Sequence, residues 1–68
     1  MPQAKVINDA TRRVLEAVYK HFPDATAWDQ ADATDEIINR ALNTWGLDAY
    51  DRLVKMNDSE ILALLHVE

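Results

Sequence analysis

Apolar residues recur along most of this chain at the three- and four-residue spacing of an amphipathic α-helix. In the first third, the positions that share one side of such a helix are Ile7, Val14, Leu15, Val18, Tyr19 and Phe22. The opposite side would carry a row of solvent-exposed charged side chains spaced four residues apart, namely Arg12, Glu16 and Lys20. The pattern therefore predicts one helix with a single buried face.

The ends of this first helix have their own signals. Asn8 or Asp9 can cap the free N–H groups, and Pro23 disfavours helical geometry in the residue before it. His21 would lie in the last turn, where a cation suits the helix dipole. We expect a helix over residues 10–22.

Residues 24–35 allow two interpretations. Aspartates lower its helix propensity, yet a helical rhythm continues through Trp28, Ala31, Ile38, Ala41, Leu42 and Trp45. We favour a loop with a short turn after Thr26, whose spacing to Asp29 is a capping pattern, and a main helix starting near Thr34. The alternative is one helix over residues 27–45. Either helix should end at Gly46, which is suited to the left-handed conformation at a C-cap.

Two short helices should follow. The first would run over residues 49–56 with Asp48 as its cap. The second should begin at the capping box Asn57-Asp58-Ser59-Glu60, with Met56 and Ile61 placed as a hydrophobic staple. Such a short helix cannot stand alone in water, so it must dock onto its own chain or another. Leu64, Leu65 and Val67 are predicted core residues, or else a dimer seam, and Trp45 is a predicted core residue.

The predicted fold class is all-α, a single small domain over residues 1–68 built as a bundle of four short helices. A single glycine and two prolines disfavour a hairpin-rich β fold. A chain of 68 residues buries only about 60% of the surface of its unfolded form, and it has no cysteine for disulfides. We therefore expect completion of the bundle by homodimerisation.

Charge is unevenly distributed. Residues 1–21 carry four basic side chains against two acidic ones, whereas residues 22–68 carry three against ten, a net charge of −7. Phosphate backbones should repel this larger part, and basic surfaces should attract it. No apolar run reaches the roughly 20 residues that cross a bilayer. We expect a cytoplasmic protein with a protein partner rather than nucleic acid or membrane.

Candidate chemistry is sparse. His21 and His66 are the bases that a catalytic arrangement would need, and both are better explained as residues at helix ends. A calcium loop needs oxygen ligands at alternating positions and a central glycine, but counting from Asp24 the fifth residue is Trp28. We therefore predict no enzymatic activity, no metal and no cofactor.

Two arrangements for DNA binding are conceivable. A helix-turn-helix could be formed around Gly46, but its recognition helix would begin with Asp48, Ala49, Tyr50 and Asp51 instead of basic or amide side chains. A ribbon-helix-helix would use residues 3–7 as its ribbon. A small DNA-binding regulator of one of these two types is the first alternative function. A docking or dimerisation module of a larger assembly is the second.

Two ten-residue stretches resemble known families. Val14 to Pro23 is similar to the first helix of the small acidic IscX-type accessory proteins of iron–sulfur assembly, although their later acidic run is missing here. Met56 to Leu65 looks like the tail of a C-terminal docking domain from a modular polyketide synthase. These fragments do not assign the chain to a family.

The predicted binding site is the acidic segment after the first helix. In residues 22–68 each basic side chain follows an acid by four positions, as Arg40 follows Glu36, so those charges should neutralise one another within helices. The surplus of negative charge falls on the segment around Trp28, an aromatic residue that could anchor a partner. The predicted site residues are Asp24, Trp28, Asp29, Asp32, Asp35 and Glu36. This segment favours a non-enzymatic adaptor or inhibitor that covers a basic surface of a larger protein.

Overall fold

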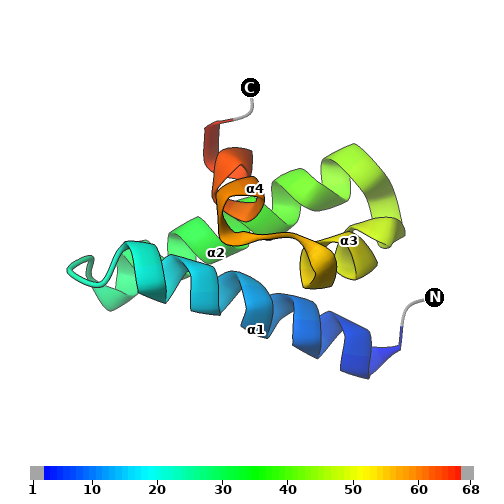
Figure 1. Ribbon diagram of the computed structural model, residues 1–68, viewed down its shortest axis with the longest axis horizontal. Coiled ribbons are helices and arrows are strands. Elements are labelled where there is room, and N and C mark those ends of the chain that lie inside the picture. The colour runs from blue at the N-terminus through cyan, green and yellow to red at the C-terminus, as the bar shows by residue number, and fades with distance from the viewer. Residues whose placement is uncertain (1–2, 67–68) are drawn as a thin grey trace.

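Two long helices form most of the molecule. The computed structural model describes residues 3–66. Helix α1 spans Ala4–His21, and the chain then reverses into helix α2, which spans Ala27–Trp45 (Figure 1). At the far end of α2 a 3-10 turn, η1 (Gly46–Asp48), leads into α3 (Ala49–Lys55), and α4 (Asp58–Ala63) continues into a second 3-10 turn, η2 (Leu64–His66). No strand occurs within residues 3–66.

The all-helical prediction is confirmed, but the bundle of four short helices needs correction. Three helices, α1, α2 and α3, pack against one another as the body of the domain. Two of them are long, with 18 and 19 residues. The six residues of α4, extended by η2, form a short segment that lies on α1 and α2 (Figure 1).

Helix α1 begins six residues before its predicted start at residue 10. Its N-cap is Gln3, whose carbonyl accepts hydrogen bonds from the N–H groups of Val6 and Ile7. Asn8 and Asp9 lie inside the helix, so the prediction that one of them caps it was wrong. The stop before Pro23 is confirmed, one residue earlier than predicted: the C-cap Phe22 donates its N–H to the carbonyl of Val18 at 2.8 Å.

Helix α2 is continuous from residue 27, so the favoured loop between Thr26 and Thr34 was wrong and the alternative, one helix over residues 27–45, is confirmed. Thr26 is the N-cap, and its side chain accepts from the backbone N–H of Asp29 at 3.1 Å, as the capping pattern predicted. Thr34, Ile37 and Ala41 are buried along one face. Packing of that face outweighs the low helix propensity of the aspartates.

Gly46 turns the chain out of α2. Its φ of 62° and ψ of −143° belong to a region that glycine alone adopts readily, although ψ differs from that of the predicted left-handed helical conformation. The predicted cap on α3 was wrong, because Asp48 has helical dihedral angles and makes no capping hydrogen bond. Helix α3 ends at Lys55, one residue before its predicted end.

The start of α4 is confirmed as a capping box. Asn57 accepts from the N–H of Glu60 at 2.9 Å, and Glu60 accepts from the N–H of Asn57 at 3.1 Å. Ile61 and Leu64 are buried within their own chain, and Leu65 packs against the core. The predicted core residue Val67 lies outside the described residues.

The core is small and rich in alanine. Its buried apolar residues are Ala10, Val14, Ala17, Val18, Ile37, Ala41, Ala49, Leu53, Ile61 and Leu64. Trp45, predicted in the core, is partly buried against it. The Cα radius of gyration is 11.2 Å, compared with about 11 Å expected for a compact chain of this length. One chain therefore closes its own core.

Candidate functional site

The predicted site residues lie on one side of the first half of α2 and in the turn before it. Asp24 belongs to the turn between α1 and α2, and the other five belong to α2. Trp28, Asp32 and Asp35 are four and three residues apart, so they project from the same face of the helix. All six predicted residues are exposed. This face, which we call the acidic face (Asp24, Trp28, Asp29, Asp32, Asp35 and Glu36), points away from the core.

Trp28 is the most exposed large apolar side chain of residues 3–66, with 82% of its surface accessible. It occupies the second position of α2, and Asp29 follows it in the first turn. A tryptophan is among the most favourable side chains to bury, so its exposure leaves that free energy for an interaction with another molecule.

Four of the five carboxylates on the acidic face lack a cationic partner within residues 3–66. Glu36 is the exception, because Arg40 donates to it at 2.7 Å, as predicted. The other two predicted pairs, formed by Arg52 and Lys55 with the acids four residues before them, do not form within ion-pair distance in the described chain. Arg52 lies instead over the ring of Trp45, 5.2 Å from its centroid. The negative charge of the face therefore remains largely uncompensated.

An apolar pocket of about 250 Å³ adjoins the acidic face. Its apolar lining comes from the end of α1, the turn, α2 and η2, through Val18, Phe22, Ala25, Ala33 and Leu65. Asp29 and Gln30 are the polar lining residues within residues 3–66, and Asp29 is the one ionisable residue of the lining in that range. We call this hollow the turn pocket. The sequence prediction missed it, because its walls come from segments far apart in the chain; the only signal was the apolar Phe22 beside the turn.

Hydrogen bonds fix the walls of the turn pocket. The side-chain amide of Gln30 donates to the carbonyl of Phe22 at 2.9 Å, and the N–H of Ala25 donates to the same carbonyl at 3.2 Å. Arg40 donates to the carbonyls of Leu64 and Leu65, each at 3.2 Å. The turn and the η2 wall are thus both attached to α2.

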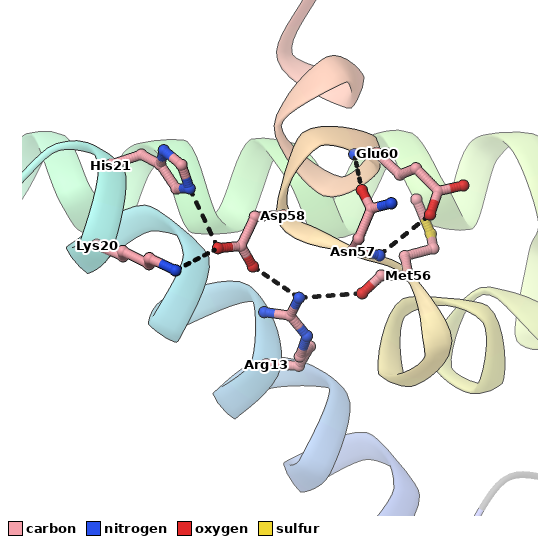
Figure 2. A network of polar contacts seen from close by, with 7 residues as sticks. All are labelled: Arg13, Lys20, His21, Met56, Asn57, Asp58 and Glu60. Carbon is pink, nitrogen blue, oxygen red and sulfur yellow. Dashed lines mark hydrogen bonds and ion pairs between the residues drawn. The ribbon is translucent and has the colours of Figure 1, made fainter.

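A second polar cluster joins α1 to the start of α4 (Figure 2). Asp58 accepts from Arg13 at 2.6 Å, and its other oxygen lies 3.1 Å from His21 Nε2 and 3.7 Å from Lys20 Nζ. Hydrogen bonds from Arg13, and then from His21, lower the pKa of Asp58 below its ordinary value of 3.8. Arg13 also donates to the carbonyl of Met56 at 3.0 Å. The cluster fixes the position of α4.

Both histidines lie at the ends of helical segments, as predicted. His21 lies in the last turn of α1, where a cation suits the helix dipole, and its ring also contacts a carboxylate of α4. Within residues 3–66 its ring has no hydroxyl partner that could serve as a nucleophile. His66 lies exposed at the end of η2. No group of three or more metal-ligating side chains comes together in this part of the chain.

The structure also bears on the two arrangements for DNA binding. Residues 4–7 belong to helix α1, so they do not form the ribbon that a ribbon-helix-helix would need. At the start of α3, Ala49 is buried and Tyr50 is partly buried, which leaves Asp48 and Asp51 as the exposed side chains. A recognition helix placed there would present carboxylates to DNA.

None of the helices in the described chain is long and apolar enough to span a membrane. Comparisons with known protein families, with curated proteins and with solved structures give no match to this chain.

Proposed function

We propose that this protein is a non-enzymatic interaction domain, an adaptor or inhibitor, that covers a basic surface of a larger protein with its acidic face. The observation that carries the proposal is Trp28, which is 82% exposed on a helix face where Asp32 and Asp35 have no cation within ion-pair distance in residues 3–66. Uncompensated carboxylates steer a basic partner, and an exposed tryptophan supplies the apolar contact that slows dissociation.

One carboxylate of the acidic face has a structural role in its own helix. Asp29 lies in the first turn of α2, where its charge suits the helix dipole. Asp32 and Asp35 lie beyond that turn, so neither the capping of α2 nor an ion pair in the described chain explains them. Their charge is therefore better explained by an external partner.

DNA binding is the alternative function, and the geometry supports it less. Helix α3 is seven residues long, and the exposed side chains at its start are those of Asp48, the residue before the helix, and Asp51. Phosphates would be repelled where a recognition helix should approach them. A gel-shift experiment with host promoter DNA tests this point: a specific complex that survives non-specific competitor DNA would favour the alternative.

Homodimerisation stays a prediction. Ile61 and Leu64 are buried in their own chain, so a dimer would use other apolar side chains, among which Leu47 and Val54 are exposed. Linkage requires the melting temperature of a dimer to rise with protein concentration. A constant melting temperature together with a monomer mass in sedimentation would contradict the dimer.

The test of the proposed function starts with capture of the partner from the native host and its identification by mass spectrometry. The triple variant Asp24→Asn, Asp29→Asn, Asp32→Asn keeps polar side chains and removes three charges from the acidic face. Association with the partner at low salt should slow and lose much of its salt dependence. Trp28→Ala should weaken binding by about 2 kcal/mol or more, mainly through faster dissociation.

The matched control removes the same charge elsewhere. Glu16→Gln, Asp48→Asn and Asp51→Asn change three exposed carboxylates on α1 and at the start of α3. This variant should associate nearly as fast as the parent. The proposal is wrong if the two triple variants slow association equally, or if neither does.

A further inference from the structure

We propose that the turn pocket receives one apolar side chain from a linear basic segment of the partner, with a lysine or arginine of that segment beside Asp29. This inference rests on the proposed function and specifies the chemistry of the partner. It combines an apolar pocket of about 250 Å³ with the carboxylate that lines it.

The lining selects an apolar group. Among the described lining residues Gln30 is the one other polar residue, and its amide nitrogen already donates to the carbonyl of Phe22. The remaining lining consists of aliphatic side chains and the half-exposed Phe22. A side chain such as leucine, isoleucine or phenylalanine would bury this surface without leaving a polar group unpaired.

The pocket is also formed before any partner arrives. The wall formed by the turn is held by the hydrogen bonds to the carbonyl of Phe22, and the wall formed by η2 is held where Arg40 binds the carbonyls of Leu64 and Leu65. Binding therefore does not require these walls to become ordered, which reduces its entropic cost. With a volume below the roughly 300–1,000 Å³ of pockets that enclose drug-sized ligands, it suits one side chain.

Charge complementarity indicates which residues flank the inserted apolar side chain in the partner's segment. Asp29 lines the pocket, and Asp32 is one helical turn further along α2. Neither has a cationic partner within residues 3–66. A segment that inserts an apolar side chain here places its neighbouring residues near these two carboxylates, so lysine or arginine next to the anchor is favoured and acidic residues are disfavoured.

The experiment selects random linear peptides that bind the full chain and then measures the affinities of synthetic peptides for matched variants. The selected peptides should share one large apolar residue flanked by lysine or arginine. Ala33→Leu places a larger side chain in the turn pocket, whereas Ala31→Leu adds the same atoms to an exposed position of the same helix. The first should weaken binding by on the order of tenfold or more, and the second should leave it nearly unchanged.

A second measurement does not depend on how well a variant folds. On titration of a selected peptide into the parent protein, the largest amide chemical-shift changes should fall at Ala25, Asp29, Ala33 and Leu65. Changes elsewhere, a failure to enrich apolar anchors, or equal binding to Ala33→Leu and the parent would overturn the pocket proposal.

The outcomes also separate this proposal from the proposed function. If basic residues are enriched and the Asn triple variant binds less, but filling the pocket has no effect, the acidic face is a binding site and the turn pocket is not its anchor. If apolar anchors bind in the pocket without any preference for basic neighbours, the pocket binds peptides, but both the basic-partner function and the role of Asp29 are wrong.

Discussion

Arg13 on α1 and Asp58 at the start of α4 form an ion pair across 45 positions of the sequence, with 2.6 Å between the guanidinium nitrogen and the carboxylate oxygen. The same nitrogen of Arg13 donates to the carbonyl of Met56, two residues before Asp58 (Figure 2). One side chain thus holds both the start of the α3–α4 connection and the first residue of α4. Because α4 is too short to be stable alone, this attachment contributes to whether it forms.

The first prediction concerns the pH dependence of this attachment. The folded-state pKa of Asp58 is lowered, so its carboxylate stabilises the fold above the ordinary pKa of 3.8, and this stabilisation is lost as pH falls through the lower folded value. Asp58→Asn should lower the melting temperature at neutral pH. The difference in melting temperature between this variant and the parent should become smaller below pH 3.8. Asp51→Asn, at an exposed site without an ion pair in the described chain, is the control. A gap independent of pH would contradict the prediction.

The second prediction concerns the capping box of α4. Asn57→Ala removes the acceptor for the N–H of Glu60, so it should lower stability by about 1 kcal/mol. In a domain of this size that corresponds to about 4–8 °C in melting temperature. Ser59→Ala, at an exposed position of the same turn that forms no side-chain hydrogen bond in the described chain, should change the melting temperature far less. Equal melting of Asn57→Ala and the parent would mean that the cap does not stabilise α4.

The elements that the sequence predicts well are those whose signals are local. The capping box of α4 lies within four consecutive residues, and the end of α2 is marked by Gly46. The start of α1 was misplaced because Asn8 and Asp9 are good capping residues, although Ile7 already continued the apolar stripe into the preceding turn. A residue with cap propensity inside a helix cannot be distinguished from a true cap without the packing that extends the helix.

Features that depend on tertiary contacts were missed. The aspartates of α2 favoured a loop, and only the burial of Thr34 and Ile37 on the opposite face explains why the helix is continuous. The acidic face itself was predicted, because charge and spacing are properties of the sequence. The turn pocket was not, since Phe22 and Leu65 meet there across more than half of the chain.

The third prediction concerns the turn after α2. Gly46 has φ of 62°, and a Cβ atom added there would meet nothing within 4 Å. Gly46→Ala therefore introduces backbone strain and no steric clash. This strain should lower the free energy of unfolding by about 1–2 kcal/mol. Leu47→Ala, at the exposed neighbouring position, is the control and should cost less, as measured by urea unfolding. If Gly46→Ala is as stable as the parent, the positive φ is not required for the turn.

The last prediction concerns Arg40, which links α2 to the carbonyls of Leu64 and Leu65 in η2. The last carbonyls of a helical segment have no partner within it, so a cation that binds them stabilises the C-terminal turn. Arg40→Met keeps an apolar stem and removes the donors. It should lower stability by about 1–2 kcal/mol and increase amide hydrogen exchange in α4 and η2 before that in α1.

Glu36→Gln is the matched control for this change. It removes the ion pair with Arg40 but leaves the hydrogen bonds from Arg40 to η2 in place. An exposed pair spaced by four residues contributes about 0.3–0.5 kcal/mol, so this variant should be close to the parent in urea unfolding and in exchange rates. If Glu36→Gln and Arg40→Met destabilise the protein equally, the surface ion pair accounts for the effect of Arg40. If only Arg40→Met loosens η2, the carbonyl contacts hold Leu65 at the wall of the turn pocket, and selected peptides should bind that variant more weakly.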